Sequence, residues 1–229
     1  MRVLAAALLT LMGAGALAED SPLEPLITGD ALRPWEAVGR LNFKGSGFCT
    51  GALIRDNLVL TAAHCLYDKT TDRQIDVGEI EFLAGWGNGR AAAYRNVRRA
   101  VIHPEYLFEE AGSHARVQND VAILELERPI RTTAITPFLI DDEPRKGDEV
   151  GVVSYAHDRA ETPSIQEVCH VLARQSGMLI TSCDVDFGAS GAPIFSFAGS
   201  QQRIVSDVSA KAEVGDEQVS LGTALEGSL

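Results

Sequence analysis

Short apolar runs alternate with turn-forming Gly, Pro, Asn and Asp residues along most of this chain of 229 residues. Short runs rich in Val, Ile, Leu and Phe and bounded by turns are typical of β-strands. The clearest pair is formed by residues 50–54 and 58–62, which flank a turn at Arg55-Asp56-Asn57. The pattern predicts further strands at residues 79–84, 96–102, 121–126, 149–154, 168–173, 178–182, 192–197, 204–210 and 219–225.

Signals for helices are weak. Residues 61–66 are compatible with one short turn after a strand, and no other stretch shows the spacing of an amphipathic helix. Residues 128–144 contain three prolines and suit a connection between two halves. Residues 19–32 are polar and irregular, which is typical of a loose N-terminal arm or a short propeptide. Evenly spaced strands predict an all-β sandwich or a pair of barrels, not βαβ units.

The first 18 residues have the layout of a secretory signal peptide. Arg2 provides a positive start, residues 3–17 are apolar, and Ala16 and Ala18 mark the expected cleavage point. A transmembrane anchor is the alternative, but the run is shorter than the ~20 apolar residues that a bilayer requires. We therefore expect an exported protein, periplasmic or secreted, that does not act in a membrane.

The net charge of the chain limits the kinds of molecule that it is expected to bind. The formal net charge is −12, from 32 acidic and 20 basic side chains. An acidic surface repels nucleic acids and anionic membranes, so neither is expected as a partner. Without the signal peptide the chain is still long enough for one large domain or two small ones.

The four cysteines are Cys49, Cys65, Cys169 and Cys183. An even number in an exported chain favours two disulfides, for which three pairings exist. Pairing between sequence neighbours would close two short loops, each worth ~3 kcal/mol in the chain-entropy model. Zinc is the alternative, but no C-x-x-C pair exists and export favours oxidation. Calcium could bind Asp141-Asp142-Glu143, although a solvated loop is the simpler explanation. No metal or cofactor is expected.

Three segments carry what acyl transfer by a serine requires: a base, a carboxylate that orients the base, and N–H donors for the oxyanion. In Leu60-Thr61-Ala62-Ala63-His64-Cys65 a strand delivers a histidine beside a cysteine. In Asn119-Asp120 a carboxylate precedes an apolar strand. In Gly188-Ala189-Ser190-Gly191 small residues permit a tight turn that exposes the serine.

Each segment has a simpler explanation when taken alone. A histidine in a strand is more often structural, Asn-Asp before a strand is ordinary turn chemistry, and small residues around a serine are common in loops. Their occurrence together, in the order His, Asp, Ser and each beside a strand, favours catalysis.

Together these segments resemble the histidine, aspartate and serine boxes of the trypsin/chymotrypsin superfamily, and the resemblance extends over most of residues 35–225. Residues 34–41, Cys49-Thr50-Gly51 and the Cys169 and Cys183-Asp184 pair resemble the bacterial branch that includes the glutamyl endopeptidases. The resemblance implies two six-stranded antiparallel Greek-key β-barrels with the active site between them. It places a peptidase domain at residues 35–229, with a first barrel at about 35–130 and a second at about 131–229, after an arm or propeptide at 19–34.

The resemblance also implies a role for each residue. Ser190 is the expected nucleophile, His64 the general base and then acid, and Asp120 the group that orients His64. The N–H groups of Gly188 and Ser190 are the expected oxyanion hole. The implied protein is a secreted serine endopeptidase that hydrolyses peptide or protein substrates through an acyl-enzyme. We expect it to be a monomer.

Specificity stays open because two charges point in opposite directions. Asp184, six residues before Ser190, occupies a position that selects Arg or Lys in trypsin-like enzymes. Lys211 could instead favour acidic residues. The strand containing Ser209, Ala210 and Lys211 is expected to line the other wall of the same pocket. His170 could approach this pocket, but its spacing indicates no partner.

Ala189 departs from the superfamily, because animal enzymes of trypsin type have an aspartate there that pairs with the newly cut N-terminal amine. Alanine cannot form that pair, so activation of the trypsin type is not expected.

Two other functions use the same fold. One is a catalytically inactive homologue that acts as a binding protein, for which Ala189 is the best argument. The other is an esterase or transferase with the same triad.

Overall fold

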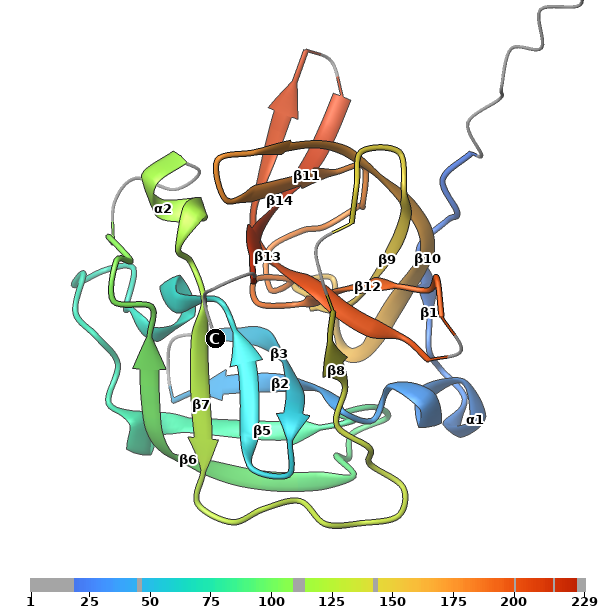
Figure 1. Ribbon diagram of the computed structural model, residues 1–229. Coiled ribbons are helices and arrows are strands. Elements are labelled where there is room, and N and C mark those ends of the chain that lie inside the picture. Colours follow the sequence, from blue (N-terminus) through green and yellow to red (C-terminus); the bar gives the residue numbers. More distant parts are fainter. Residues whose placement is uncertain are drawn as a thin grey trace, which may run out of the picture.

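The computed structural model describes residues 19–44, 47–108, 114–141, 144–199, 201–215 and 217–225. The predicted signal peptide lies outside these residues. The described chain forms two β-barrels, the first in blue to green and the second in yellow to red (Figure 1). Among the described residues, no helix is long and apolar enough to cross a membrane.

Six antiparallel strands close the first barrel in the order β2-β3-β4-β7-β6-β5. The predicted strand pair around residues 55–57 is confirmed as β3 and β4, in which Ala52 pairs with Leu60. The strands are β2 (Val38–Phe43), β3 (Gly47–Arg55), β4 (Leu58–Thr61), β5 (Ile80–Ala84), β6 (Ala93–Ile102) and β7 (Ala122–Leu126).

Strand β2 is missing from the strands that the apolar pattern predicts. Arg40 and Asn42 interrupt its apolar residues, and Gly39 lowers its strand propensity. The glycine has a packing reason, because a Cβ there would lie 2.4 Å from the Phe82 ring and 2.6 Å from the Leu83 carbonyl oxygen. Close approach of β5 therefore selects glycine at this position.

The second barrel is closed by β10-β11-β14-β13-β12-β9 together with a direct pairing of β9 and β10. Strand β10 is much longer than the predicted strand at 168–173, and two register shifts against β9 let it bend around the barrel. The strands are β9 (Glu149–Ala156), β10 (Arg159–Gln175), β11 (Met178–Thr181), β12 (Pro193–Ser196), β13 (Arg203–Val214) and β14 (Glu217–Ala224). The two-barrel architecture implied by the resemblance is confirmed.

Residues 19–35 form an ordered arm along the second barrel, shown in blue beside β10 in Figure 1, and not the loose arm that their polar composition indicates. β1 (Glu24–Pro25) pairs with β10. α1 (Gly29–Leu32) begins at Thr28, whose hydroxyl accepts the N–H of Ala31, and leads into η1 (Arg33–Trp35). Buried Leu26, Leu32 and Trp35 anchor the arm.

The remaining short elements connect the strands. η2 (Ala63–Leu66) confirms the turn predicted within residues 61–66. The helical turns η3 (Val77–Glu79) and α2 (His114–Gln118) are too short to leave an amphipathic pattern in the sequence. The proline-rich connection 128–144 contains β8 (Leu139–Ile140), which pairs in parallel with β13.

One apolar cluster extends from the first barrel to residues of the second, while the interior of the second barrel forms a cluster of its own. Trp35 contacts Phe195 of the second barrel with ring centroids 5.1 Å apart, and Phe138 contacts the same ring at 4.7 Å. Tyr155 of β9 is fully buried against the first barrel, and its hydroxyl donates to the Trp86 carbonyl oxygen at 2.7 Å. This continuous packing fixes one barrel relative to the other, which any site built from both barrels requires.

Candidate active site

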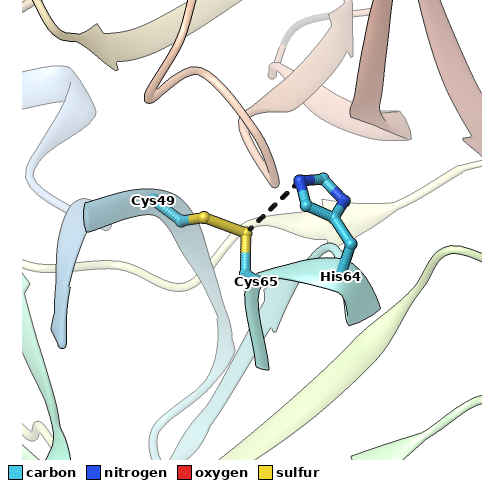
Figure 2. Close-up of side chains that lie close together, drawn as sticks. All are labelled: Cys49, His64 and Cys65. Carbon is cyan, nitrogen blue, oxygen red and sulfur yellow. Dashed lines mark hydrogen bonds between the residues drawn. A yellow bond between two sulfur atoms is a disulfide. The ribbon is translucent and has the colours of Figure 1, made fainter. Parts of the chain in front are cut away.

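The backbone of His64 is held in place by a short helical turn and by the disulfide at the next residue. It lies in η2, directly after β4, and its side chain is 3% exposed. Cys65 forms a disulfide with Cys49 of β3, and the Cys65 Sγ lies 4.0 Å from His64 Nε2 (Figure 2). The second disulfide joins Cys169 and Cys183, so the two predicted disulfides are confirmed, and of the three possible pairings the structure has the one between sequence neighbours.

Asp120 is the partner of His64. Its side chain is fully buried between α2 and β7. Asp120 Oδ2 accepts the Nδ1–H of His64 at 2.7 Å, and Oδ1 accepts the His64 backbone N–H at 2.8 Å. The Ser209 hydroxyl also donates to Oδ2. With the proton on Nδ1 directed at a carboxylate, the Nε2 lone pair is free to act as a base.

These contacts determine the charge of Asp120. Burial opposes ionisation, but the nearby imidazole and the hydrogen bonds from His64 and Ser209 outweigh it, so the pKa of Asp120 lies below its usual value. Thr223 fixes the backbone, because its hydroxyl donates to the carbonyl oxygens of Val117 at 2.9 Å and Asp120 at 3.3 Å. The carboxylate is therefore ionised and immobile at neutral pH.

Ser190 lies on a tight loop between β11 and β12, and its side chain is half-buried. The loop carbonyls are bound: the Phe187 oxygen accepts the His157 N–H at 2.7 Å, and the Ser190 oxygen accepts the Thr50 N–H at 2.9 Å. Within the described part of the chain, the N–H groups of Gly188 and Ser190 have no acceptor. Two free N–H groups beside a serine are what an oxyanion hole requires.

Glycine is required at two positions of this loop. Gly188 has φ +100°, and a Cβ there would lie 2.5 Å from the Phe48 ring. Gly191 has φ +74°, and a Cβ there would lie 2.1 Å from the Thr61 hydroxyl oxygen. Larger residues would push the loop away from the first barrel, so both glycines serve its close docking.

A cleft of about 490 Å³ lies beside His64 and Ser190. Its apolar wall comes from both barrels, and Phe187 is 76% exposed at its edge. The backbone of His157, a residue without a predicted role, helps to shape it. The lining includes Phe43, Phe48, Tyr67, Ile75, His157 and Phe187.

The residues predicted to set specificity do not line the cleft beside His64 and Ser190. Asp184 and Lys211 are exposed, Ala210 is half-buried, and none of them lines this cleft. The Asp184 N–H donates to the Gln166 side chain at 2.7 Å, which in turn donates to the Ser21 carbonyl oxygen in the N-terminal arm. The Ser209 hydroxyl is directed at Asp120, so this side chain supports the His64–Asp120 pair.

His170 has a partner that its spacing does not indicate. Asp20 of the N-terminal arm lies 2.7 Å from His170 Nδ1. The contact joins residues far apart in sequence, so no local pattern predicts it. It ties the arm to β10 and leaves His170 outside the cleft.

Three potential metal ligands lie together among the described residues: the donor atoms of Cys49, His64 and Cys65 are all within 4.8 Å of one another. Both cysteines are joined in the disulfide of Figure 2, so neither offers a thiolate. This group therefore does not fit a metal. Two of the three residues in the acidic run 141–143 lie outside the described residues.

Two buried residues near the site are absent from the predicted set. Thr50 contacts the Ser190 loop, and Asp207 is a fully buried carboxyl on β13 for which neither oxygen has a hydrogen-bond partner among the described residues. A charged residue within the apolar stretch 204–210 was the available signal for Asp207. Thr50 has no such signal, because its partners are distant in sequence.

Known proteins share this chain's sequence features. The family model described as Trypsin matches residues 28–215. Complement C1r-A subcomponent of Mus musculus is 31% identical over 47% of this chain and 15% of that protein. Trypsin of Phaedon cochleariae is 36% identical over 36% of this chain and 29% of that protein. Serine protease filzig of Drosophila melanogaster is 29% identical over 48% of this chain and 6% of that protein. The chain spans less than a third of the length of each of these relatives.

A solved structure of a Glu endopeptidase in complex with MPD has the same fold. The TM-score is 0.73 at 19% identity, over 91% of this chain and 93% of that chain. At this identity the likeness concerns the fold alone. Because the Trypsin family model matches most of the sequence, the predicted resemblance is confirmed, and this chain belongs to the trypsin family of serine proteases.

Proposed function

We propose that this protein is an active serine endopeptidase that uses His64, Asp120 and Ser190 as a catalytic triad. The observation that carries the proposal is the combination of a buried, hydrogen-bonded His64–Asp120 pair with a serine loop whose two N–H groups are free. The first part supplies a base with a fixed tautomer, and the second supplies donors for a developing oxyanion.

The reaction follows from these parts. His64 Nε2 takes the Ser190 proton while Oγ attacks the scissile carbonyl carbon, and the Gly188 and Ser190 N–H groups stabilise the oxyanion. The imidazolium, stabilised by Asp120, gives the proton to the leaving amine, and an acyl-enzyme on Ser190 remains. Water, deprotonated by His64, then attacks the ester and releases the acid product and Ser190.

The same features argue against a catalytically inactive binding protein. That alternative rests on Ala189, which could leave the oxyanion loop unsupported. Ala189 is fully buried in the apolar core of the second barrel, and its N–H donates to the Asp186 carbonyl oxygen at 2.9 Å. Packing therefore supports the loop where an ion pair is absent, and an active site is the better reading.

Peptides and proteins outside the cytoplasm are the proposed substrates. The cleft beside His64 and Ser190 has a volume of about 490 Å³ and is lined by both apolar and polar residues. The two disulfides suit an oxidising compartment, which agrees with export by the predicted signal peptide. We propose a secreted or periplasmic monomer that binds neither nucleic acid nor membrane.

Proteolysis by a Ser190→Ala variant tests the proposal. We expect kcat on a peptide library to fall by about 10⁶-fold, because the nucleophile is lost. Ser176→Gly is the matched control, since Ser176 is an exposed turn residue with φ 48°. Cleavage by Ser190→Ala at the wild-type rate would contradict the assignment, as would a wild-type protein that folds and cleaves no peptide.

A further inference from the structure

The Ser190 loop is held in place by Thr50, a fully buried residue of the first barrel. We propose that Thr50 is the positioning residue that keeps the oxyanion hole formed at all times, so that the hole depends on no new N-terminus. The inference rests on the proposed function, because an oxyanion hole has meaning only for an acyl-transfer enzyme.

The hydroxyl of Thr50 joins the two barrels. It lies 3.0 Å from the Gly188 carbonyl oxygen and 3.1 Å from the Tyr155 backbone nitrogen. A carbonyl oxygen can only accept and a backbone N–H can only donate, so the hydroxyl donates to Gly188 and accepts from Tyr155. Valine has the same shape but can form neither bond.

The backbone of Thr50 makes a second contact with the loop. On one side Thr50 pairs with Arg40 of β2. On the other side β4 ends at Thr61, so Thr50 has no strand partner there. The Thr50 N–H donates to the Ser190 carbonyl oxygen at 2.9 Å, and the Thr50 carbonyl oxygen accepts the Thr61 hydroxyl at 2.8 Å. Because the ladder between β3 and β4 ends here, the Thr50 N–H is available to the Ser190 loop, and the loop carbonyl satisfies this buried donor.

Together these bonds orient the peptide groups of the loop. A trans peptide directs its N–H and C=O to opposite sides. The Phe187 oxygen is bound to the His157 N–H, which turns the Gly188 N–H the other way. The Ala189 oxygen accepts the Ala192 N–H at 2.9 Å, which turns the Ser190 N–H away in the same manner. Thr50 binds the carbonyls of the two adjoining peptides, at Gly188 and Ser190, and so holds the loop in the conformation that leaves both N–H groups free.

This arrangement uses no charge. Ala189 offers no carboxylate, and the N-terminal arm reaches β10 through Asp20 and Ser21 without a hydrogen bond to residues 186–191 among the described residues. The Thr50 contacts come from the body of the first barrel, which is folded whatever the state of the N-terminus. The hole should be present as soon as the barrels fold.

Kinetics of Thr50→Val and Thr50→Ser test the proposal, with a fluorogenic peptide as the substrate. For Thr50→Val we expect kcat to fall by about 10²-fold, as when an oxyanion donor is lost, while KM changes little. Thr50→Ser keeps the hydroxyl and should recover most of kcat. A merely structural role would lower Tm in both variants without this separation of kcat from KM.

A second measurement compares wild-type chains that begin at Glu19 with chains that carry a Gly-Ser extension before it. We expect equal kcat, because Thr50 and not the N-terminus holds the loop. A folded Thr50→Val variant with wild-type kcat would overturn the proposal. If Thr50→Val does not fold, an inactive Thr50→Ser or a loss of activity on extension would overturn it. Each of these results would overturn the role of Thr50 alone. The proposed function would still hold if the wild-type protein cleaves the peptide and Ser190→Ala does not.

Discussion

Asp120 and Asp207 are both fully buried and lie close enough for the charge of Asp120 to affect Asp207, but their surroundings are opposite. Asp120 accepts hydrogen bonds from His64 and Ser209, and its pKa lies below the usual value. Neither oxygen of Asp207 has a partner among the described residues. Burial, with a further contribution from the charge of Asp120, raises the pKa of Asp207 well above its usual value.

The two carboxyls are close because of strand register. Asp207 lies opposite Thr223 in the pairing of β13 with β14, so their side chains share one face. The Thr223 hydroxyl donates to the Asp120 carbonyl oxygen on that face. The comparison teaches that burial alone does not determine the charge of an acid. Hydrogen-bond partners keep Asp120 ionised, and their absence keeps Asp207 neutral.

The largest expected effect comes from Asp120→Asn. The amide would favour the wrong tautomer of His64, so we expect kcat to fall by about 10⁴-fold with little change in the fold. Steady-state kinetics and circular dichroism measure the two quantities. Asp207→Asn is the matched control, because it makes the same chemical change at an equally buried position. Equal losses in the two variants would contradict the comparison.

A smaller effect is expected from Ser209→Ala. One of the hydrogen bonds to the Asp120 carboxylate is lost, while both bonds from His64 remain. We expect kcat to fall about tenfold, which corresponds to ~1.4 kcal/mol. An increase in KM with unchanged kcat would assign Ser209 to substrate binding instead.

The smallest expected effect concerns stability. The raised pKa of Asp207 means that above the ordinary value of 3.8 the native state holds a proton that the unfolded chain releases. Stability from this group therefore falls as pH rises, and Asp207→Asn removes the loss. We expect the gain in the free energy of unfolding to vanish near pH 3 and to grow above the ordinary aspartate pKa by up to about 1.4 kcal/mol for each pH unit.

Urea unfolding of both proteins at several pH values measures this difference. Asp158→Asn, at an exposed aspartate, is the control and should show no such trend. A constant or declining difference between Asp207→Asn and wild type would mean that Asp207 is ionised when folded. In that case an unrecognised partner must hold its charge.

Sequence patterns predict the local parts of this molecule well. The pair β3 and β4, the turn that contains His64 and the two disulfides all join residues close in sequence, so their spacing carries the information. Strand β2 escapes prediction because Arg40 and Asn42 interrupt its apolar residues and because Gly39, which the close approach of β5 requires, has low strand propensity. The contact of Thr50 with Gly188 escapes because it crosses both barrels and needs a three-dimensional fold to be seen.

The family resemblance predicts that Asp120 orients His64. In the structure the Asp120 carboxylate lies within hydrogen-bond distance of His64 Nδ1. The opposite state of Asp207 could not be foreseen in the same way. Its charged side chain is visible in the sequence, but the absence of hydrogen-bond partners among the described residues depends on how the folded chain packs around β13.

The most direct test of the central claim is to treat the folded protein with a fluorophosphonate and to map the adduct by peptide mass spectrometry. The account predicts one modified residue, Ser190, in wild type, and none in Ser190→Ala, because a formed base and oxyanion hole activate that hydroxyl alone. A folded wild-type protein that stays unmodified, or a label on another serine, would contradict it.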